Sequence, residues 1–116
     1  MTVNIYGIKS CDTMKKAFTW LDQAGISYRF HDYKKEGAPE KALRQWIRKL
    51  GWETVINRRG TTWRKLPEDE RQNMDADTAV TAALANPSLI KRPIIEQGTI
   101  VLAGFDADTW QRTLHK

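Results

Sequence analysis

The hydrophobic pattern of the first 31 residues changes from alternation to helical spacing and back, and this restricts the fold more than any other sequence feature. Residues 2–6 alternate between apolar and polar, which is typical of a half-buried strand, and Gly7 interrupts the alternation. From Asp12 onward apolar residues recur at helical spacing, and Gly25 stands where a residue with positive φ commonly closes a helix. Residues 26–31 alternate again. The pattern predicts a strand, a helix and a second strand.

A connection of this length favours parallel pairing of the two strands, and such crossovers are nearly always right-handed. Ligand sites in open sheets of this kind form beyond the carboxyl ends of the strands. Cys11 is the one cysteine of the chain, and it follows the carboxyl end of the first predicted strand. We therefore expect the site of the protein at this position.

The central part of the chain, about residues 38–90, is predicted to be a helical insertion. Pro39 suits the first turn of a helix whose apolar stripe continues to residue 50. Either Asp75 or Asp77 can cap another helix, which Asn86-Pro87 would end. The apolar residues expected on that helix are Ala79, Val80, Ala83 and Leu84.

The carboxyl-terminal part of the chain contains two short apolar runs, residues 93–96 and 99–103. They predict an antiparallel hairpin with Gln97-Gly98 as its turn. Either Asp106 or Asp108 then caps a last helix. The element order is β-α-β, then helices, then β-β-α.

The length of 116 residues fits one compact domain, so we expect residues 1–116 to form a single α/β domain. No apolar run approaches the roughly 18 to 20 residues of a membrane span, and the first residues do not resemble a secretion signal. A lone cysteine cannot form an internal disulfide, which favours a free thiol in the cytoplasm. The net charge of +5 suits anionic small molecules, acidic partners or nucleic acid, and it does not choose among them.

The position of Cys11 favours a reactive thiol. At a helix start its sulfur can lie near unpaired backbone amides and the positive end of the helix dipole, which stabilise the thiolate. The alternative is a buried structural cysteine that behaves as a small hydrophobic residue. Four polar neighbours make this loop a candidate substrate-binding segment: Lys9, Ser10, Asp12 and Thr13.

Met14 occupies the position of the second cysteine in a C-x-x-C dithiol motif. The second thiol of an exchange reaction must therefore come from another molecule. In a reducing cytosol the abundant candidate is glutathione, and exchange would pass through a mixed disulfide at Cys11.

Two basic segments are candidates for anion binding. Residues 57–65 carry four basic residues and no acidic one, so they can bind an oxyanion or carboxylate or form a solvated basic loop. Arg92 precedes Pro93, and this pair can present a planar anion donor on a fixed backbone, although most surface arginines have no such role. The tryptophans fall mostly within apolar patterns, and we identify no stacking platform among them.

Three segments together resemble the ArsC/Spx family, and most closely its YffB branch: Ile5–Ala17, Asn57–Leu66 and Asn86–Ile94. The resemblance runs from about residue 2 to residue 114. It implies a thioredoxin-like fold with an inserted helical segment, in agreement with the predicted element order.

The resemblance also implies a site. Cys11 matches the catalytic cysteine of the family, and the Arg92-Pro93 peptide bond is expected to be cis. In the arsenate reductases an arginine of the central loop and the arginine of the Arg-Pro pair hold the oxyanion. By position, the first looks like Arg58 or Arg59 and the second like Arg92.

Two differences from the family pattern limit what can be transferred. Arsenate reductases carry a further arginine after the last strand, where this chain reads Leu102–Asp106, so arsenate specificity is not expected. The Spx regulators, which contact RNA polymerase, commonly carry a C-x-x-C redox switch, and Met14 replaces its second cysteine.

The leading hypothesis is a glutathione-dependent thiol reductase in which Cys11 attacks a small thiol, disulfide or oxyanion substrate. Arg58, Arg59 and Arg92, with Pro93, would bind the anionic group. The alternatives are an arsenate reductase that uses glutathione and glutaredoxin, and an Spx-like protein that binds a transcription partner without catalysis. We expect a monomer with no metal, no membrane contact and no nucleic acid partner.

Overall fold

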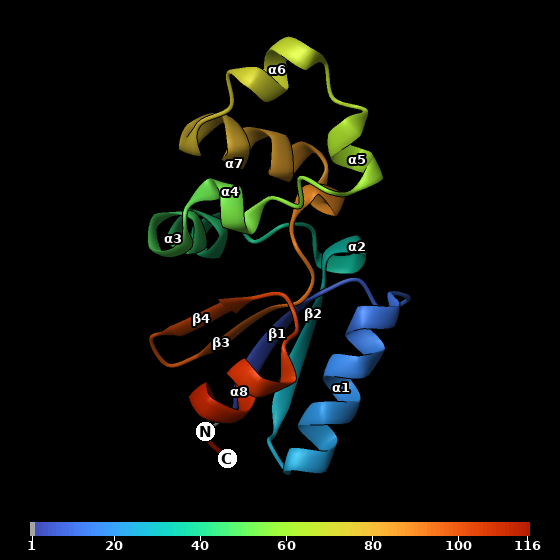
Figure 1. The fold of residues 1–116 in the computed structure, drawn as a ribbon, viewed down its shortest axis with the longest axis vertical. Helices are drawn as coiled ribbons and strands as arrows, with labels where there is room; N and C mark the ends of the chain where they lie inside the picture. The colour runs from blue at the N-terminus through green and yellow to red at the C-terminus, as the bar shows by residue number, and fades with distance from the viewer. Residues whose placement is uncertain (1) are drawn as a thin grey trace. The chain divides into compact units, whose positions relative to one another are not determined.

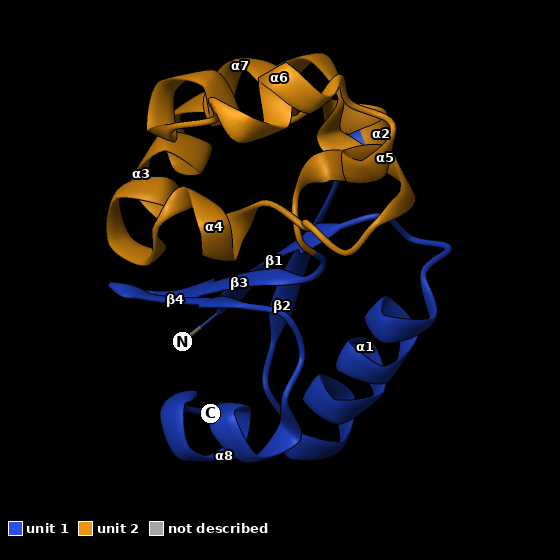
Figure 2. Cartoon of the chain, turned by 45° about the horizontal axis from the view of Figure 1, so that its top comes forward, with its two compact units in different colours: residues 1–33, 92–116 blue, residues 34–91 orange. Residues whose placement is uncertain are grey.

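The structure is a computed structural model that describes residues 2–116 and divides into two compact units. The first unit comprises residues 2–33 and 92–116, and the second comprises residues 34–91 (Figure 2). The predicted helical insertion at residues 38–90 falls within the second unit. The expectation of a single domain over residues 1–116 stays a prediction.

The first unit contains a four-stranded sheet with the strand order β2-β1-β3-β4 (Figure 1). Its strands are β1 (Val3–Gly7), β2 (Tyr28–Asp32), β3 (Ile94–Gln97) and β4 (Ile100–Ala103). β1 pairs parallel with β2 and antiparallel with β3, and β3 pairs antiparallel with β4. These pairings confirm the predicted parallel crossover and the predicted hairpin. Each connection has the length that its pairing requires.

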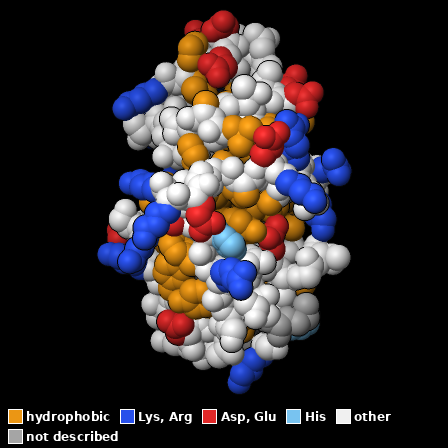
Figure 3. All heavy atoms as spheres, turned by 180° about the vertical axis from the view of Figure 1, so that it is seen from behind, with side chains coloured by type: hydrophobic (Ala, Val, Ile, Leu, Met, Phe, Trp, Pro, Cys, Tyr) orange, Lys and Arg blue, Asp and Glu red, His pale blue; other side chains and the backbone are white. Residues whose placement is uncertain are grey.

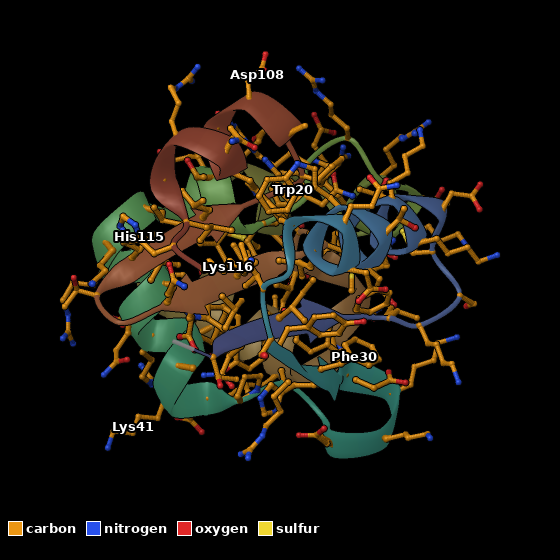
Figure 4. All side chains as sticks on the ribbon, turned by 90° about the horizontal axis from the view of Figure 1, so that it is seen from below. Trp20, Phe30, Lys41, Asp108, His115 and Lys116 are labelled. Carbon is orange, nitrogen blue, oxygen red and sulfur yellow. The ribbon has the colours of Figure 1, made fainter. Side chains whose placement is uncertain are left out.

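Two helices cover one face of this sheet, α1 (Asp12–Ala24) and α8 (Ala107–Thr113), as Figure 4 shows from below. Trp20 of α1 lies against Trp110 of α8 in an edge-to-face arrangement, with ring centroids 5.6 Å apart. The alternating residues of β1 point into the same core. The buried residues of this core are Val3, Ile5, Met14, Ala17, Leu21, Ile26, Ile95, Trp110 and Leu114.

Local signals set the ends of these helices as expected. Gly25 closes α1 with φ 71°, and its amide donates to the carbonyls of Asp22 and Leu21. Asp106 is the N-cap of α8, and its carboxylate accepts from the amide of Asp108 at 3.1 Å.

The turn of the hairpin differs from the prediction by one residue. Gln97 pairs with Ile100, so the turn consists of Gly98 and Thr99 instead of Gln97 and Gly98. Gly98 has φ 61°, which a glycine adopts without strain at the first position of a tight hairpin turn. Gln97 belongs to the strand because its side chain is buried and hydrogen-bonded to His115.

The second unit is helical and contains more helices than predicted. Its helices are α2 (Tyr33–Glu36), α3 (Glu40–Leu50), α4 (Trp52–Val55), α5 (Thr61–Arg64), α6 (Glu68–Gln72) and α7 (Ala76–Ala85), followed by the 3-10 turn η1 (Pro87–Leu89). Helix α2 begins at Tyr33, the last residue of the first unit. Pro39 lies just before α3 instead of in its first turn. The four-residue helices escaped prediction because they are too short to show a period.

Asp75, one of the two predicted caps, begins α7 with a capping box. Its carboxylate accepts from the amide of Thr78 at 2.9 Å, and the Thr78 hydroxyl accepts from the amide of Asp75 at 2.8 Å. Leu84 was expected on the apolar side of this helix but is exposed, whereas Ala82 is buried. The inward face of α7 is therefore made mainly of small residues.

None of the helices within residues 2–116 has the length and apolar character needed to cross a membrane. On the face drawn in Figure 3, lysine and arginine side chains occur in several separate groups with acidic side chains among them.

Candidate functional site

Cys11 lies at the start of α1, after the loop that follows the carboxyl end of β1. Its backbone is extended, with φ −98° and ψ 134°, and its carbonyl accepts from the amide of Lys15 at 3.1 Å. Met14, which is fully buried, joins the first turn of the helix to the core. The thiol itself is half-buried. Four exposed residues flank it in the sequence: Lys9, Ser10, Asp12 and Thr13.

The pKa of the Cys11 thiol is lowered by its surroundings. Burial acts to raise this pKa, but the backbone amides of Met14 and Thr13 and the guanidinium of Arg92 together outweigh it. The Cys11 side chain makes no capping hydrogen bond at the start of α1. The amides of Met14 and Thr13 nevertheless stabilise the negative charge of its thiolate. Arg92 acts through its charge and through a hydrogen bond. The site therefore favours the nucleophilic thiolate.

The pairing of the strands brings Arg92 to Cys11. β3 is antiparallel to β1, with Ile94 opposite Tyr6, so the amino end of β3 meets the carboxyl end of β1. Arg92 precedes that end, and Cys11 follows the other. The half-exposed Arg92 is the basic residue that lowers the pKa of Cys11, and its role as an anion donor stays a prediction.

Pro93 is buried beside this site, and the Arg92-Pro93 peptide bond is cis, as the family resemblance implied. The Pro93 carbonyl accepts from the amide of Gly104 at 2.7 Å. Gly104 lies in the segment where arsenate reductases carry their further arginine. In this chain that segment contributes a backbone contact to the Arg-Pro turn.

A group of polar side chains on β1, β2 and β3 was not identified from the sequence. The Tyr6 hydroxyl donates to Glu96 at 2.8 Å, and the Tyr6 ring stacks on His31 with centroids 4.6 Å apart. His31 Nε2 lies 3.1 Å from Asn4 Oδ1. The alternation of residues 2–6 places Asn4 and Tyr6 on one face, but it does not reveal their cross-strand partners.

Tyr33 follows β2 at the same end of the sheet and is 2% exposed. Its hydroxyl has no hydrogen-bond partner among residues 2–116. Burial raises the pKa of Tyr33, the Tyr6 and Glu96 charges act in the same direction, and Arg92 opposes them. Tyr33 is therefore a protonated phenol in the electrostatic environment of Arg92.

The predicted basic loop lies within the second unit, where backbone contacts fix the segment at its start. The amide of Asn57 donates to Leu89 at 2.7 Å, and the amide of Lys91 donates to Val55 at 2.8 Å. Inside the loop, Asn57 Oδ1 accepts from the amide of Arg59 at 3.2 Å. Arg58 and Arg59 are exposed, and their predicted role at the Cys11 site stays a prediction.

Trp52, which precedes this loop, and Trp63, which lies within it, stack on each other, a contact that the sequence analysis did not identify. The rings of Trp52 and Trp63 have centroids 6.2 Å apart and an interplanar angle of 28°. The Arg58 guanidinium carbon lies 5.6 Å from the centroid of the Trp52 ring. No hydrophobic period could reveal this stack, because the two rings come from separate short helices.

The structure thus brings Cys11, Arg92 and Pro93 together in the first unit with the Thr13 amide, while Lys9, Ser10 and Asp12 flank the thiol in sequence. Residues 2–116 contain no cluster of three or more His, Cys, Asp or Glu side chains that could hold a metal ion.

Comparison with known proteins identifies the family of this arrangement. The model of the ArsC family matches residues 6–113. The chain belongs to the ArsC family. A solved structure named YFFB protein is 49% identical, covers 97% of this chain and 99% of its own, and superposes with a TM-score of 0.93. The predicted membership and the predicted thioredoxin-like α/β fold are both confirmed.

Other ArsC family relatives carry two kinds of name. A solution structure of an arsenate reductase (ArsC) related protein from Brucella melitensis is 50% identical, covers 97% of this chain and 94% of its own, and has a TM-score of 0.78. The global transcriptional regulator Spx from Listeria innocua is 28% identical over 97% of this chain and 86% of its own length. The relatives therefore include both reductase-related and regulatory proteins.

Proposed function

We propose that this ArsC family chain is a glutathione-dependent thiol reductase whose nucleophile is Cys11. The observation that carries the proposal is the lowered pKa of Cys11 beside the hydrogen-bonding guanidinium of Arg92. A thiolate is the reactive form in disulfide exchange. Because Cys11 is the only cysteine, the second thiol comes from another molecule, and glutathione supplies it.

The reaction has two exchange steps. The Cys11 thiolate attacks the glutathione sulfur of a mixed disulfide between glutathione and a substrate thiol. A new S–S bond forms at Cys11, the old one breaks, and the released substrate thiolate takes a proton from solvent. A glutathione thiolate then attacks the Cys11–glutathione disulfide and leaves as glutathione disulfide. The net reaction converts the mixed disulfide and one glutathione into the substrate thiol and glutathione disulfide.

Each site residue has a role in these steps. Arg92 stabilises the Cys11 thiolate and orients the anionic group of the incoming molecule. Ser10, Lys9, Asp12 and Thr13 offer exposed polar groups next to the thiol, and Pro93 holds the backbone beside Arg92. On the basis of the family resemblance, we propose that Arg58 or Arg59 binds a carboxylate of glutathione.

Arsenate reduction is a second candidate, favoured by the 50% identity to the Brucella melitensis protein. Arg92 suits an oxyanion, and Cys11 would form a thiol–arsenate adduct that glutathione and glutaredoxin reduce. The glycine at position 104, in the segment of the further arginine, weakens this candidate. A turnover assay with arsenate, glutathione and glutaredoxin distinguishes it from thiol reduction.

An Spx-like binding role is a third candidate, favoured by the 28% identity to the Listeria innocua regulator. The methionine at position 14 removes the second cysteine of a C-x-x-C switch, so such binding would be independent of a disulfide at this motif. A stable complex with RNA polymerase that is indifferent to Cys11→Ser would support this candidate over catalysis.

The main experiment incubates the protein with glutathione disulfide and follows it by intact-mass spectrometry. One glutathione should add, at Cys11, and glutathione should then remove it. Cys11→Ser should take up none and should not reduce the mixed disulfide of glutathione and cysteine. Wild-type protein that takes up no glutathione would contradict the proposal.

A further inference from the structure

The second unit contains a layered arrangement of three side chains: Trp63, Trp52 and Arg58. The Trp52 and Trp63 rings stack with centroids 6.2 Å apart, and the Arg58 guanidinium lies over the Trp52 ring at 5.6 Å. Both indoles are half-buried, whereas Arg58 is exposed. The order therefore runs from the half-buried Trp63 through Trp52 to an exposed cation.

The backbone on both sides of Arg58 is held in place. Asn57 Oδ1 accepts from the amide of Arg59, and Arg64 Nη2 donates to the Arg59 carbonyl at 2.9 Å. Gly60 closes the turn tightly, because a Cβ atom there would lie 2.9 Å from Asn57 Nδ2. The direction in which the Arg58 side chain leaves the loop is thus set by local contacts.

The stack restricts the remaining freedom of the Arg58 side chain. An exposed arginine normally samples many rotamers, and ordering it on binding lowers affinity. A guanidinium that lies on an aromatic face is held by cation–π attraction, while its N–H groups stay at the edge of the plane. That edge is the part that binds a carboxylate with two parallel hydrogen bonds.

No hydrogen bond or ion pair occupies the Arg58 guanidinium within residues 2–116. The neighbouring bases Arg59, Arg64 and Lys65 add positive charge without an acidic residue in the loop. The arrangement has the features of a prepared anion site: a fixed backbone, an oriented planar donor and a positive surrounding.

We propose that Trp52 and Trp63 are positioning residues that hold the Arg58 guanidinium ready to bind a carboxylate of glutathione. This inference rests on the proposed function for the identity of the ligand. The stack itself is independent of that function. Trp52 acts through Arg58, and Trp63 acts through Trp52.

The test is a double-mutant cycle with two readouts. Binding of S-methylglutathione, which cannot undergo thiol exchange, is measured by tryptophan fluorescence or calorimetry, and turnover with glutathione gives KM and kcat. Arg58→Ala should weaken binding roughly tenfold or more, as for the loss of a hydrogen bond to a charged group. Trp52→Leu should weaken it about two- to fivefold, as for an exposed cation–π contact. Trp52→Phe, which keeps an aromatic face, should retain most of the affinity.

The double variant decides whether Trp52 acts through Arg58. Adding Trp52→Leu to Arg58→Ala should cause no further loss of binding. In the Arg58→Ala and Trp52→Leu variants, KM for glutathione should change while kcat stays near the wild-type value. Arg48→Ala removes an exposed guanidinium of α3 and is the matched control, which should bind as wild type. The diethyl ester of S-methylglutathione, which lacks both carboxylates, should bind weakly to wild type and equally to Arg58→Ala.

Several outcomes would overturn the inference. It is wrong if Trp52→Leu weakens binding equally with and without Arg58, or if Arg58→Ala binds as tightly as wild type. If Trp52→Leu does not fold, judged by its thermal midpoint, the cycle is completed with Trp63→Leu, which acts through Trp52. Absence of turnover together with normal S-methylglutathione binding would reject the proposed reductase activity but not this anion site.

Discussion

Arg92 lowers the pKa of the Cys11 thiol through the charge of its guanidinium and through hydrogen bonding. The two residues are far apart in the sequence, and they meet because β3 runs antiparallel to β1. A guanidinium beside a sulfur at a helix start favours the thiolate over the thiol. This pair is the physical basis of the proposed reactivity, and it can be tested directly.

The first prediction concerns the pH dependence of Cys11 alkylation. The midpoint should lie below the value of about 8.5 for a free thiol, because the site stabilises the negative form. Arg92→Ala removes a positive charge, so the midpoint should move up. Arg112→Ala removes an exposed guanidinium from α8 and should leave the midpoint unchanged. A wild-type midpoint at or above the free-thiol value would remove the main reason for calling Cys11 catalytic.

The second prediction separates the charge of Arg92 from its shape. Arg92→Lys keeps the charge but loses the planar pair of donors, so the rate of glutathionylation should fall more than the thiol pKa changes. Arg92→Ala should affect both, with a rate loss of roughly tenfold to over a hundredfold. The glutathionylation rate is measured by mixing each variant with glutathione disulfide, quenching at set times and determining the modified fraction by mass spectrometry. If both variants keep the wild-type rate and pKa while folded, Arg92 is only a surface charge.

The third prediction concerns the Tyr33 hydroxyl, which is buried without a partner in the described structure. Tyr33→Phe keeps the ring and removes the unsatisfied hydroxyl, so the free energy of unfolding should rise by about 1 kcal/mol. Tyr6→Phe is the matched comparison, because it removes a hydroxyl that donates to Glu96, and it should lower stability. Urea unfolding of both variants measures this. A loss of stability in Tyr33→Phe would show that the hydroxyl has a partner.

The fourth prediction concerns the attachment of the chain end to the sheet. Gln97 is 2% exposed, and its side-chain amide donates to the His115 carbonyl and accepts from the His115 amide. Gln97→Leu leaves both backbone groups without this partner, and we expect a loss of roughly 1–3 kcal/mol in the free energy of unfolding. His115→Ala should change stability little, because the contacts use only the backbone of His115. Equal effects of the two variants would contradict this account.

Much of the first unit could be predicted from the sequence because its signals are local. Alternation in residues 2–6 and helical spacing after Asp12 defined the strand and the helix, and Gly25 and Asp106 ended or began helices through contacts within a few residues. The position of Cys11 at a helix start followed from the same patterns. The direction of its pKa shift was also predictable, because backbone amides are unpaired at every helix start.

Other features depended on contacts that no local pattern carries. The burial of Tyr33 and the inclusion of Gln97 in its strand arise from segments that meet only in the folded chain. The four-residue helices α4 and α5 show no period, so the stack of Trp52 on Trp63 could not be anticipated.

The sequence by itself therefore determined the order of the elements and the residue at the helix start. Only the tertiary structure decided which base reaches the thiol and which arginine lies on an aromatic ring. The physical reason is that periodicity and capping report energies within a few residues of the chain. Charge and stacking interactions instead depend on distances in space, which the strand pairing and the loop backbone fix.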